Sequence, residues 1–368
     1  MTKPASFEDA GAVLDVSLSA LKSNYRLLAK QAGAARCGAS VKADAYGLGA
    51  SSVAQALAEE GCRDFFLAHP SEAKRLVGLV PDDARLFVLN GLPKGTEALT
   101  ADLPQLVPVL NSVAQAEAWA VESQRQGRAL PAALHIDTGM SRLGLSAGEA
   151  MRLKQEGLLS RFDLQLVMSH LASAEDAGAV SNKRQLDAFI AIRVAFADVP
   201  ASLANGSGVF LGAAYAFDLV RPGAALYGLN PQANTTNPMH QVVRLSAPVI
   251  QNRMVEAGAS VGYNGIFTAP RAMPAATIAI GYGDGWLRRA GGLAGFFEGV
   301  RLPIIGRISM DTTVLDCSAL GKRLLQPGDH VELLCESQTP DQVAAASGTI
   351  GYEILTAIGS RVRRNYVA

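Results

Sequence analysis

The sequence predicts an α/β protein in which an N-terminal (β/α)8 TIM-like barrel is followed by a C-terminal, mostly β domain. Three observations indicate this fold class. The chain has 368 residues, short apolar runs alternate with helical stretches between about residues 35 and 230, and strand-like segments dominate beyond about residue 235. A chain of this length has room for a large barrel and a smaller second domain.

The apolar runs of the first part are the expected barrel strands, at residues 37–42, 64–68, 85–90, 106–110, 132–137, 164–170, 201–205 and 218–221. Stretches with helical spacing lie between them, for example at 51–61, 111–126 and 182–197. Strands that alternate with helices form a parallel sheet, and eight such units in about 200 residues favour a closed barrel. On this pattern alone, an open, doubly wound sheet is an alternative.

The second part is rich in strand patterns separated by Gly, Pro and Asp turns, at residues 242–258, 275–285, 300–310, 312–316 and 330–334. One helical stretch intervenes near 340–357. The polar segment NPQANTTNPM at 230–239 is the expected boundary. We therefore expect a barrel domain at 12–235 and a β domain at 236–368.

Composition argues against several classes of protein. Lys plus Arg and Asp plus Glu each total 33, and this balance is unlike the basic excess of most nucleic-acid binders. The four cysteines form no CxxC pair, so reduced thiols in a cytoplasmic protein are the simpler interpretation. The N-terminus lacks the apolar core of a signal peptide, and no apolar run is as long as a membrane span.

Polar residues gather where the expected barrel strands end, which is where barrel enzymes build their active sites. They are Lys42, Asp137, Thr138, Arg142, His170, the segment Asn205-Gly206-Ser207-Gly208, and Arg221-Pro222-Gly223. Each has an ordinary alternative, because lysines and arginines are usually solvated, single histidines are usually structural, and glycine-rich turns are common. The five histidines are scattered and do not cluster with cysteines, so no metal site is expected.

Two of these features suggest chemistry when they are taken together. Lys42 follows an apolar strand, and such a setting suits a Schiff-base lysine, whose amine must be uncharged to act as a nucleophile. Gly223-Ala224 would begin a short helix whose free N–H groups favour an anion, at the usual phosphate site of a barrel. A lysine on the first strand and a phosphate site at the last strands indicate pyridoxal phosphate (PLP).

Eight segments then resemble the motifs of the bacterial alanine racemases, in family order and over nearly the whole chain. They are VKADAYGLGA at 41–50, DTGMSRLGL at 137–145, SHLASAED at 169–176, LVRPGAALYGL at 219–229, VGYNGIF at 261–267, IGYGDGWLRR at 280–289, GRISMD at 306–311 and IGYEIL at 350–355. The resemblance implies a fold-type III PLP enzyme that interconverts L- and D-alanine, for peptidoglycan precursors or for D-alanine breakdown. It also implies a homodimer with shared active sites, and an N-terminal strand at 1–11 that packs with the β domain.

The resemblance assigns two bases, one for each face of the substrate. Lys42 holds PLP and acts on D-alanine, whereas Tyr263, from the other subunit, acts on L-alanine. A phenol is a weak base at its ordinary pKa of about 10, and positive charge nearby would favour the phenolate. His170 is expected to link Tyr263 to Arg221, and Arg221 to donate to the pyridine nitrogen of PLP.

The remaining expected site residues also follow from the resemblance. The phosphate group would be held by Tyr46, Ser207, Gly223, Ala224 and Tyr352, with Asn205 beside them. Arg142 would contact the phenolic oxygen of PLP and the substrate, and the Met310 backbone would bind the substrate carboxylate. The access corridor would be lined by Glu175, Tyr282, Arg288 and Arg307.

Three positions depart from the family pattern. Gly206 stands at the position of the usual phosphate-binding serine, so Ser207 would have to take over that role. His135 stands where many members carry a carbamylated lysine, so we expect an anion such as chloride near Arg142. Ser309 stands where some members have cysteine.

Three alternatives to an alanine racemase stay open. One is a PLP-dependent amino-acid decarboxylase of the same architecture, and this enzyme would not need Tyr263. A second is a racemase that prefers serine or accepts a broader range of small amino acids. A third is a non-catalytic PLP carrier, and the β domain with its own tyrosines argues against it.

Overall fold

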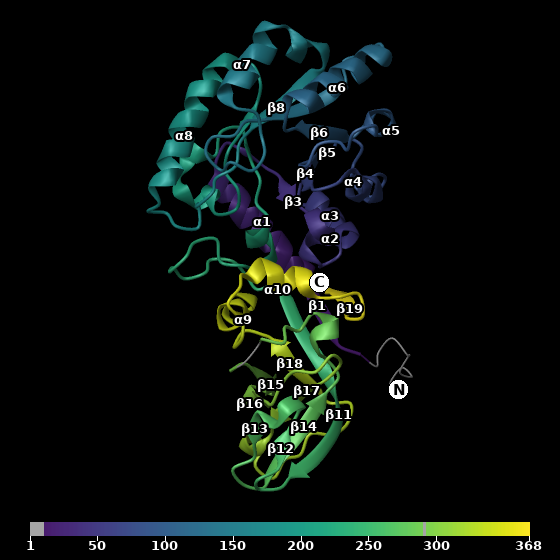
Figure 1. The fold of residues 1–368 in the computed structure, drawn as a ribbon, viewed down its shortest axis with the longest axis vertical. Helices are drawn as coiled ribbons and strands as arrows, with labels where there is room; N and C mark the ends of the chain where they lie inside the picture. The colour runs from purple at the N-terminus through teal and green to yellow at the C-terminus, as the bar shows by residue number, and fades with distance from the viewer. Residues whose placement is uncertain (1–10, 290–291) are drawn as a thin grey trace. The chain divides into compact units, whose positions relative to one another are not determined.

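The computed structural model describes residues 11–289 and 292–368. The described chain forms two compact units, residues Ala20–His240 and residues 11–19 together with Gln241–Ala368. We describe each unit by itself. Figure 1 labels their elements.

The first unit is a closed parallel barrel. Its strands are β2 (Arg36–Cys37), β3 (Ala39–Ser40), β4 (Asp64–Leu67), β5 (Arg85–Val88), β6 (Leu106–Leu110), β7 (Pro131–His135), β8 (Asp163–Met168), β9 (Ala201–Ser202) and β10 (Leu219–Val220). Strands β3 to β9 are paired in chain order, and β10 pairs in parallel with β2. A bridge between Asn205 and Arg221 joins the β9 side to the β10 side. These pairings exclude the open sheet and confirm the predicted barrel.

The first strand is broken at Gly38, between β2 and β3. A Cβ atom at this position would lie 2.7 Å from the carbonyl oxygen of Asp64, so the close approach of the two strands requires glycine. Inside the barrel, alternate residues of neighbouring strands form one apolar cluster: Phe66, Phe87, Val107, Val109, Ala133, Leu166, Met168 and Leu219. This packing fixes which side chains can reach the carboxyl end of the barrel.

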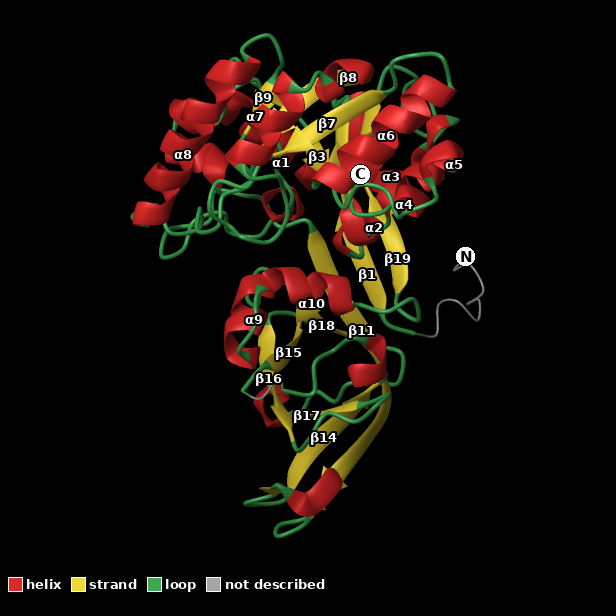
Figure 2. Ribbon diagram, turned by 45° about the horizontal axis from the view of Figure 1, so that its top comes forward, coloured by secondary structure: helices red, strands yellow, loops and turns green. Residues whose placement is uncertain are grey.

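Helices cover the outside of the barrel strands (Figure 2). They are α1 (Leu18–Ala32), α3 (Ala50–Glu59), α4 (Pro70–Leu76), α5 (Glu97–Ala101), α6 (Val113–Arg125), α7 (Ala147–Gln155) and α8 (Val180–Arg193). The short segment α2 (Lys42–Tyr46) is instead a turn that follows the first strand. The expected helical stretches at 51–61, 111–126 and 182–197 correspond to α3, α6 and α8, the last extended by the 3₁₀ turn η3 (Val194–Phe196). Between β9 and β10 the chain forms the 3₁₀ turns η4 (Gly208–Leu211) and η5 (Ala213–Tyr215).

The second unit is built on a sheet in the order β14-β17-β16-β15-β18-β11-β1-β19, with a further pairing of β14 to β11; its pairings are antiparallel except that of β1 with β19, which is parallel. Its strands are β1 (Val13–Ser17), β11 (Val243–Val255), β14 (Met273–Ile278), β15 (Ala294–Phe297), β16 (Val300–Ile305), β17 (Thr313–Asp316), β18 (His330–Leu334) and β19 (Arg363–Val367), with the small pair β12 (Ser260–Val261) and β13 (Phe267–Thr268). The strand expected at 1–11 lies, except for Gly11, outside the described residues. β1 pairs with both β11 and β19.

The prediction of a single helical stretch near 340–357 is wrong. The segment forms two helices, α9 (Pro340–Ser347) and α10 (Gly351–Ala357). They are separated at Gly348, which ends α9 in the left-handed conformation with φ of 68°, as C-terminal glycines of helices commonly do.

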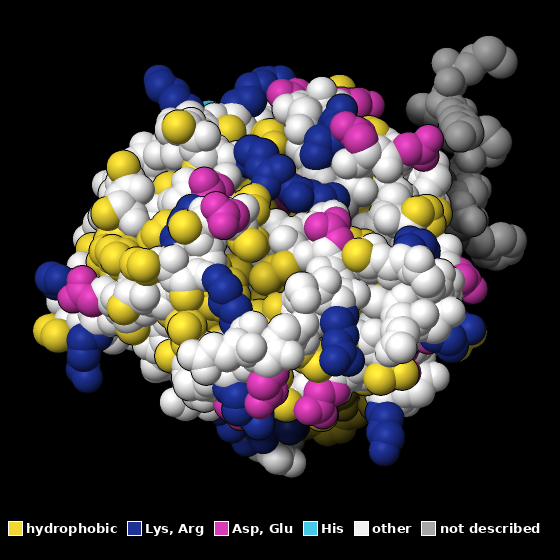
Figure 3. Space-filling view, turned by 90° about the horizontal axis from the view of Figure 1, so that it is seen from above, with side chains coloured by type: hydrophobic (Ala, Val, Ile, Leu, Met, Phe, Trp, Pro, Cys, Tyr) yellow, Lys and Arg dark blue, Asp and Glu magenta, His cyan; other side chains and the backbone are white. Residues whose placement is uncertain are grey.

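Surface charge is mixed in sign: on the face shown in Figure 3, Lys and Arg side chains are interspersed with Asp and Glu.

Candidate active site

Lys42 begins an unusual turn at the carboxyl end of the first barrel strand. Strand β3 ends at Ser40, so the strand expected at 37–42 stops earlier than the sequence suggested. The next four residues, Ala43 to Tyr46, all have φ between 53° and 56°, and Gly47 closes the turn with φ of 83°. A left-handed turn of L-residues costs roughly 1–2 kcal/mol per residue. Backbone strain is therefore concentrated immediately after Lys42.

Glu72, at the start of α4, supports this turn. One oxygen of its carboxylate accepts a hydrogen bond from the backbone N–H of Ala43 at 2.7 Å. The other accepts from the backbone N–H groups of Ala68 and His69, at 2.7 and 3.1 Å. Glu72 thus ties the lysine turn to the end of the neighbouring strand β4, and it offsets part of the strain with charge-assisted hydrogen bonds.

The environment of Lys42 favours an uncharged amine. Burial lowers the pKa of Lys42, and the positive charge of Arg142 lowers it further, while Glu72 acts in the opposite direction. The amine makes no hydrogen bond to any of the described residues. Such an amine is more nucleophilic near neutral pH than a solvated lysine.

Five polar side chains of the barrel line one cavity of about 250 Å³: Lys42, Asn90, His135, Arg142 and His170. Apolar contacts from Ala68, Leu89, Leu143 and Met168 complete the wall. The cavity therefore brings together Lys42, Arg142 and His170, three of the site residues that the sequence predicted. It also contains His135, which stands where many members of the family carry a carbamylated lysine.

Arg221 is buried and contacts His170, which lines this cavity. Its guanidinium donates to the hydroxyl of Ser202 and, at 2.6 Å, to the carbonyl oxygen of Ser169. It also lies over the ring of Phe66, 5.8 Å from the centroid. No carboxylate forms an ion pair with Arg221 in the described part of the chain, and burial lowers its pKa to about 9.

The proton position on His170 follows from its contact with Arg221. Nη2 of Arg221 lies 3.5 Å from Nδ1 of His170. A guanidinium can only donate, so Nδ1 is the acceptor. Burial, followed by the charge of Arg221, lowers the pKa of His170 well below its usual value. His170 is therefore neutral, with its proton on Nε2.

Tyr46 and Gly223 lie against each other at the expected phosphate site. A Cβ atom at Gly223 would overlap the hydroxyl oxygen of Tyr46, so only glycine allows this approach. Tyr46 is buried and packs on Tyr227, with ring centroids 4.8 Å apart. Tyr227 in turn donates to the carbonyl oxygen of Ser40 at 2.8 Å. Ala224 begins the 3₁₀ turn η6 (Ala224–Tyr227).

The segment after β9 brings Gly206 close to this site. A Cβ atom at Gly206 would lie 3.3 Å from Cβ of Ala225 and 3.7 Å from the backbone nitrogen of Gly223. Ser207 is buried one residue further on, and its carbonyl oxygen accepts from Gln232 at 3.0 Å. The side chain of Asn205 accepts from the N–H of Gly208 at 2.8 Å and so shapes the turn.

Tyr263 projects from the β domain with 63% of its surface exposed. It starts the short turn η7 (Tyr263–Gly265). The preceding Gly262 packs closely on Arg307, since a Cβ atom there would lie 3.3 Å from the Arg307 backbone nitrogen. A cavity of about 420 Å³ in this domain is lined by Arg288, Arg289 and Arg307 beside Ile266. Two of the expected corridor residues, Arg288 and Arg307, therefore share one cavity.

Tyr282 and Met310 lie on two turns that are bonded together. The N–H of Tyr282 donates to the carbonyl oxygen of Ser309 at 3.0 Å, and the N–H of Gly283 to that of Met310 at 2.8 Å. Arg361 clamps the same turns, through Asp284 at 2.9 Å and Asp311 at 2.8 Å. Both Tyr282 and Met310 are exposed on the β domain.

The remaining expected residues, Tyr352 and Glu175, line neither of the two cavities described above. Tyr352 is half-buried in α10 of the β domain, and Glu175 is exposed on a barrel loop, where its carbonyl oxygen accepts from Ala233 at 2.8 Å. Sequence reasoning missed Glu72, Ser169, Ser202, Tyr227 and Asn111. Nothing in the spacing of these residues distinguishes them from ordinary strand-end and helix-start residues.

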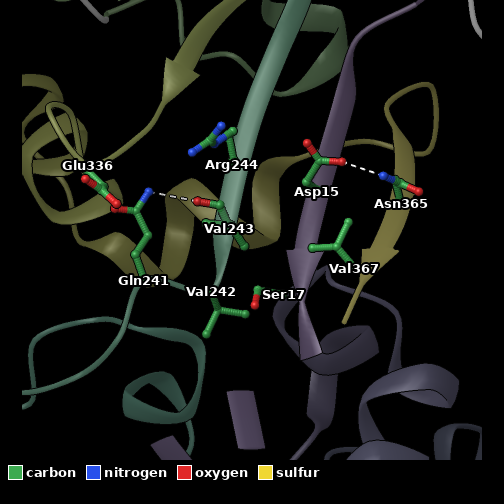
Figure 4. Close-up of a pocket in the computed structure, with 9 residues that line it drawn as sticks. All are labelled: Asp15, Ser17, Gln241, Val242, Val243, Arg244, Glu336, Asn365 and Val367. Carbon is green, nitrogen blue, oxygen red and sulfur yellow. Dashed lines mark hydrogen bonds between the residues drawn. The ribbon is translucent and has the colours of Figure 1, made fainter. Parts of the chain in front are cut away.

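A third cavity, of about 490 Å³, lies in the β domain between β1, β11 and β19 (Figure 4). Asn365 donates to Asp15 across it at 2.6 Å, and Gln241 donates to the Val243 carbonyl at 2.8 Å. None of the predicted site residues lines it. Across the described residues, we find neither a cluster that could hold a metal ion nor a helix long and apolar enough to cross a membrane.

Comparison with known proteins identifies the family. The model of the alanine racemase N-terminal domain matches residues 16–231, and that of the C-terminal domain matches residues 242–366. The chain belongs to the alanine racemase family. A catabolic alanine racemase of Mesorhizobium japonicum is 48% identical over 99% of this chain and 95% of its own length.

Solved alanine racemases have the same fold as this family member. The crystal structure of alanine racemase from Bartonella henselae, with covalently bound pyridoxal phosphate, superposes with a TM-score of 0.91 at 40% identity, covering 97% of this chain and all of that one. The biosynthetic alanine racemase of Pseudomonas aeruginosa gives 0.87 at 33% identity, covering 98% of this chain and all of that one.

Proposed function

We propose that the protein interconverts L-alanine and D-alanine with PLP, using Lys42 and Tyr263 as the two bases. The observation that carries this proposal is the barrel cavity. There, an amine with a lowered pKa faces a neutral histidine, and this histidine is backed by a buried arginine that has no carboxylate partner among the described residues. Membership of the alanine racemase family adds the reaction class.

The residues of the barrel fit PLP. Gly223 has no side chain, so the Tyr46 hydroxyl lies directly against its backbone at the phosphate site. Arg142 has no hydrogen-bond or ion-pair partner among the described residues, and a guanidinium is suited to an anionic oxygen. Lys42 would bind the cofactor covalently, Arg221 would contact its ring nitrogen, and Tyr46, Asn205, Ser207, Gly223, Ala224 and Tyr352 would hold its phosphate. When bound, PLP delocalises the charge that develops on the substrate α-carbon.

Lys42 is the base for D-alanine. Its Nζ, made less basic by burial and by Arg142, takes up a proton at the substrate α-carbon and can return one to the same face. The left-handed turn held by Glu72 limits where this amine can reach, which keeps the transfer on one face.

Tyr263 is the base for L-alanine. Its exposure on the β domain suits a residue that completes the active site of a second subunit, so we propose a homodimer with shared sites. The Nε2–H of His170 makes no hydrogen bond to the described residues, and it would donate to the phenol oxygen of Tyr263. Such a bond, backed by the charge of Arg221, stabilises the phenolate.

Arg221 has a second effect. A guanidinium donates a hydrogen bond but does not give up its proton. Arg221 would therefore leave the pyridine nitrogen of PLP unprotonated. A cofactor held in this way would be a weaker electron sink, which would disfavour competing reactions.

Substrate size would be set by residues of both domains. The backbone of Met310 would bind the alanine carboxylate together with Arg142, and Tyr282, Arg288, Arg307 and Glu175 would line a narrow corridor.

The relatives include a catabolic and a biosynthetic enzyme, so supply and breakdown of D-alanine are both compatible with the site. The four buried free cysteines fit a reducing, cytoplasmic setting.

The test is direct. Purified protein with PLP is mixed with L-alanine, and D-alanine is followed by chiral chromatography, with L-serine as a parallel substrate. We expect D-alanine to form faster than D-serine. Release of CO₂ without D-alanine would instead indicate a decarboxylase, and faster D-serine formation would indicate a serine racemase.

A further inference from the structure

His135 and Asn111 form a buried pair at the wall of the barrel cavity. His135 ends β7, Asn111 directly follows β6, and both are less than a tenth exposed. Nδ1 of His135 lies 2.8 Å from Oδ1 of Asn111. The pair therefore links the carboxyl ends of two neighbouring barrel strands.

The orientation of the Asn111 amide is fixed by two carbonyl groups. Its Nδ2 donates to the carbonyl oxygens of Leu89 at 2.9 Å and Val109 at 2.8 Å. If the amide were turned over, its oxygen would face both carbonyl oxygens and two acceptors would be left without donors. The oxygen atom of Asn111 therefore faces His135.

This orientation determines the proton position on His135. An amide oxygen can only accept, so Nδ1 of His135 carries the hydrogen. The charged and titratable groups that act on the ring are Arg221, Asp137, Arg142 and His170. Burial first, then Arg221 and, more weakly, Arg142 lower the pKa of His135 to about 4, and Asp137 acts in the opposite direction. The imidazole is therefore neutral, and Nε2 holds a lone pair.

Arg142 lines the same cavity as His135. In the described part of the chain, neither the Nε2 atom of His135 nor the guanidinium of Arg142 has a hydrogen-bond partner. One is a pure acceptor and the other a pure donor. We propose that the Asn111–His135 pair is a positioning element that presents a neutral acceptor, Nε2 of His135, to the guanidinium of Arg142.

A neutral acceptor, Nε2 of His135, affects Arg142 differently from an anion. It orients Arg142 without neutralising its charge, so the full charge stays available to an anionic oxygen of the cofactor or substrate. Arg142 would then not require a chloride ion at this position. This inference rests on the proposed function, because it assumes that Arg142 acts on a bound anionic group.

The proton position can be measured without any catalysis. We would label the ring nitrogens of the five histidines with ¹⁵N in the full-length protein and assign His135 from the signal that is lost in His135→Gln. We expect the Nδ1–H form of neutral imidazole throughout pH 5.5–8, whether or not the enzyme proves to be a racemase. A protonated Nε2, or a charged ring at pH 7, would overturn the proposal.

The effect on Arg142 is measured by PLP binding to the apoprotein, in chloride-free buffer and with added chloride. His135→Phe removes the acceptor, and we expect about tenfold weaker binding, with partial recovery in His135→Gln, whose amide oxygen can accept. His240→Gln, on an exposed histidine, is the matched control and should bind as the parent protein does.

Two outcomes of the binding measurement contradict the proposal. Equal PLP affinity of His135→Phe and the parent protein would show that Arg142 does not depend on His135. An affinity of the parent protein that rises severalfold with chloride would show that an anion, and not His135, holds Arg142. Circular dichroism of each variant identifies a loss of fold, and in that case the ¹⁵N measurement on the parent protein decides alone.

Discussion

Arg221 donates to Nδ1 of His170 across 3.5 Å, and this contact sets the protonation of the histidine. The guanidinium is held in place by Ser169 and Ser202, from the ends of two neighbouring strands. With no carboxylate paired to it among the described residues, its charge acts on His170 without compensation. The barrel thus directs an N–H group, and not a lone pair, toward whatever approaches His170 from the cavity.

Replacing Arg221 by methionine should raise the pKa of His170 toward its ordinary value of about 6.5. Burial would still hold it down, but the largest charge effect would be removed. ¹⁵N chemical shifts of His170 as a function of pH measure this change. Arg271→Met, at an exposed position of the β domain, is the control. An unchanged titration in Arg221→Met would contradict the assigned contact.

Gly223→Ala should damage the phosphate site selectively. The added Cβ would overlap the Tyr46 hydroxyl, so Tyr46 or the turn must move, at a cost of about 1–3 kcal/mol in the free energy of unfolding. We expect weaker PLP binding and a lower urea midpoint. Gly148→Ala is the matched control, because no atom lies within 4 Å of its added Cβ on α7; it should be neutral or slightly stabilising. Parent-like PLP binding in Gly223→Ala would argue against this site.

A serine at position 206 should strengthen PLP binding. Its Cβ would lie 3.7 Å from the backbone nitrogen of Gly223, so the hydroxyl could reach a phosphate held there, with a small shift of Ala225. Ser207→Ala tests the alternative donor: if Ser207 has taken over the role, this variant binds PLP about tenfold more weakly, and the double variant Gly206→Ser, Ser207→Ala recovers affinity. No change in either single variant would show that neither position contacts the phosphate.

Stability should fall as the pH is lowered below about 6.5, in part because of His135. Its pKa is about 4 in the folded chain and about 6.5 when unfolded. Between these values the unfolded chain binds a proton that the folded chain does not, so stability is lost at up to about 1.4 kcal/mol per pH unit. Urea unfolding at pH 7 and pH 5, at one protein concentration, measures this loss. His135→Gln should show a smaller loss; an equal loss in both proteins would contradict the burial of a neutral His135.

Much of the barrel could be predicted from the sequence, because alternate strand and helix patterns depend on local hydrophobic periodicity. The eight expected strands all correspond to strands of the barrel. The end of the first strand could not be predicted, since a left-handed turn of Ala43 to Tyr46 contains no glycine until Gly47. Its stability depends on Glu72, which is distant in sequence.

The chemistry of the site was predicted less completely than its location. Lys42, Arg142 and His170 follow strands, so a barrel brings them together. Their supporting residues could not be recognised, because Asn111 meets His135 only when β6 and β7 are neighbours, and Ser169 and Ser202 meet Arg221 only across β8 and β9. Pairings of this kind depend on the closed sheet and leave no local pattern.

The two-base assignment is tested most directly by the loss of α-hydrogen from each enantiomer in D₂O, followed by proton NMR, with PLP-loaded Tyr263→Phe. The account predicts that this variant still exchanges the α-hydrogen of D-alanine, through Lys42, while its exchange of the α-hydrogen of L-alanine falls by a hundredfold or more. Equal exchange of both enantiomers at the rates of the parent enzyme would contradict it.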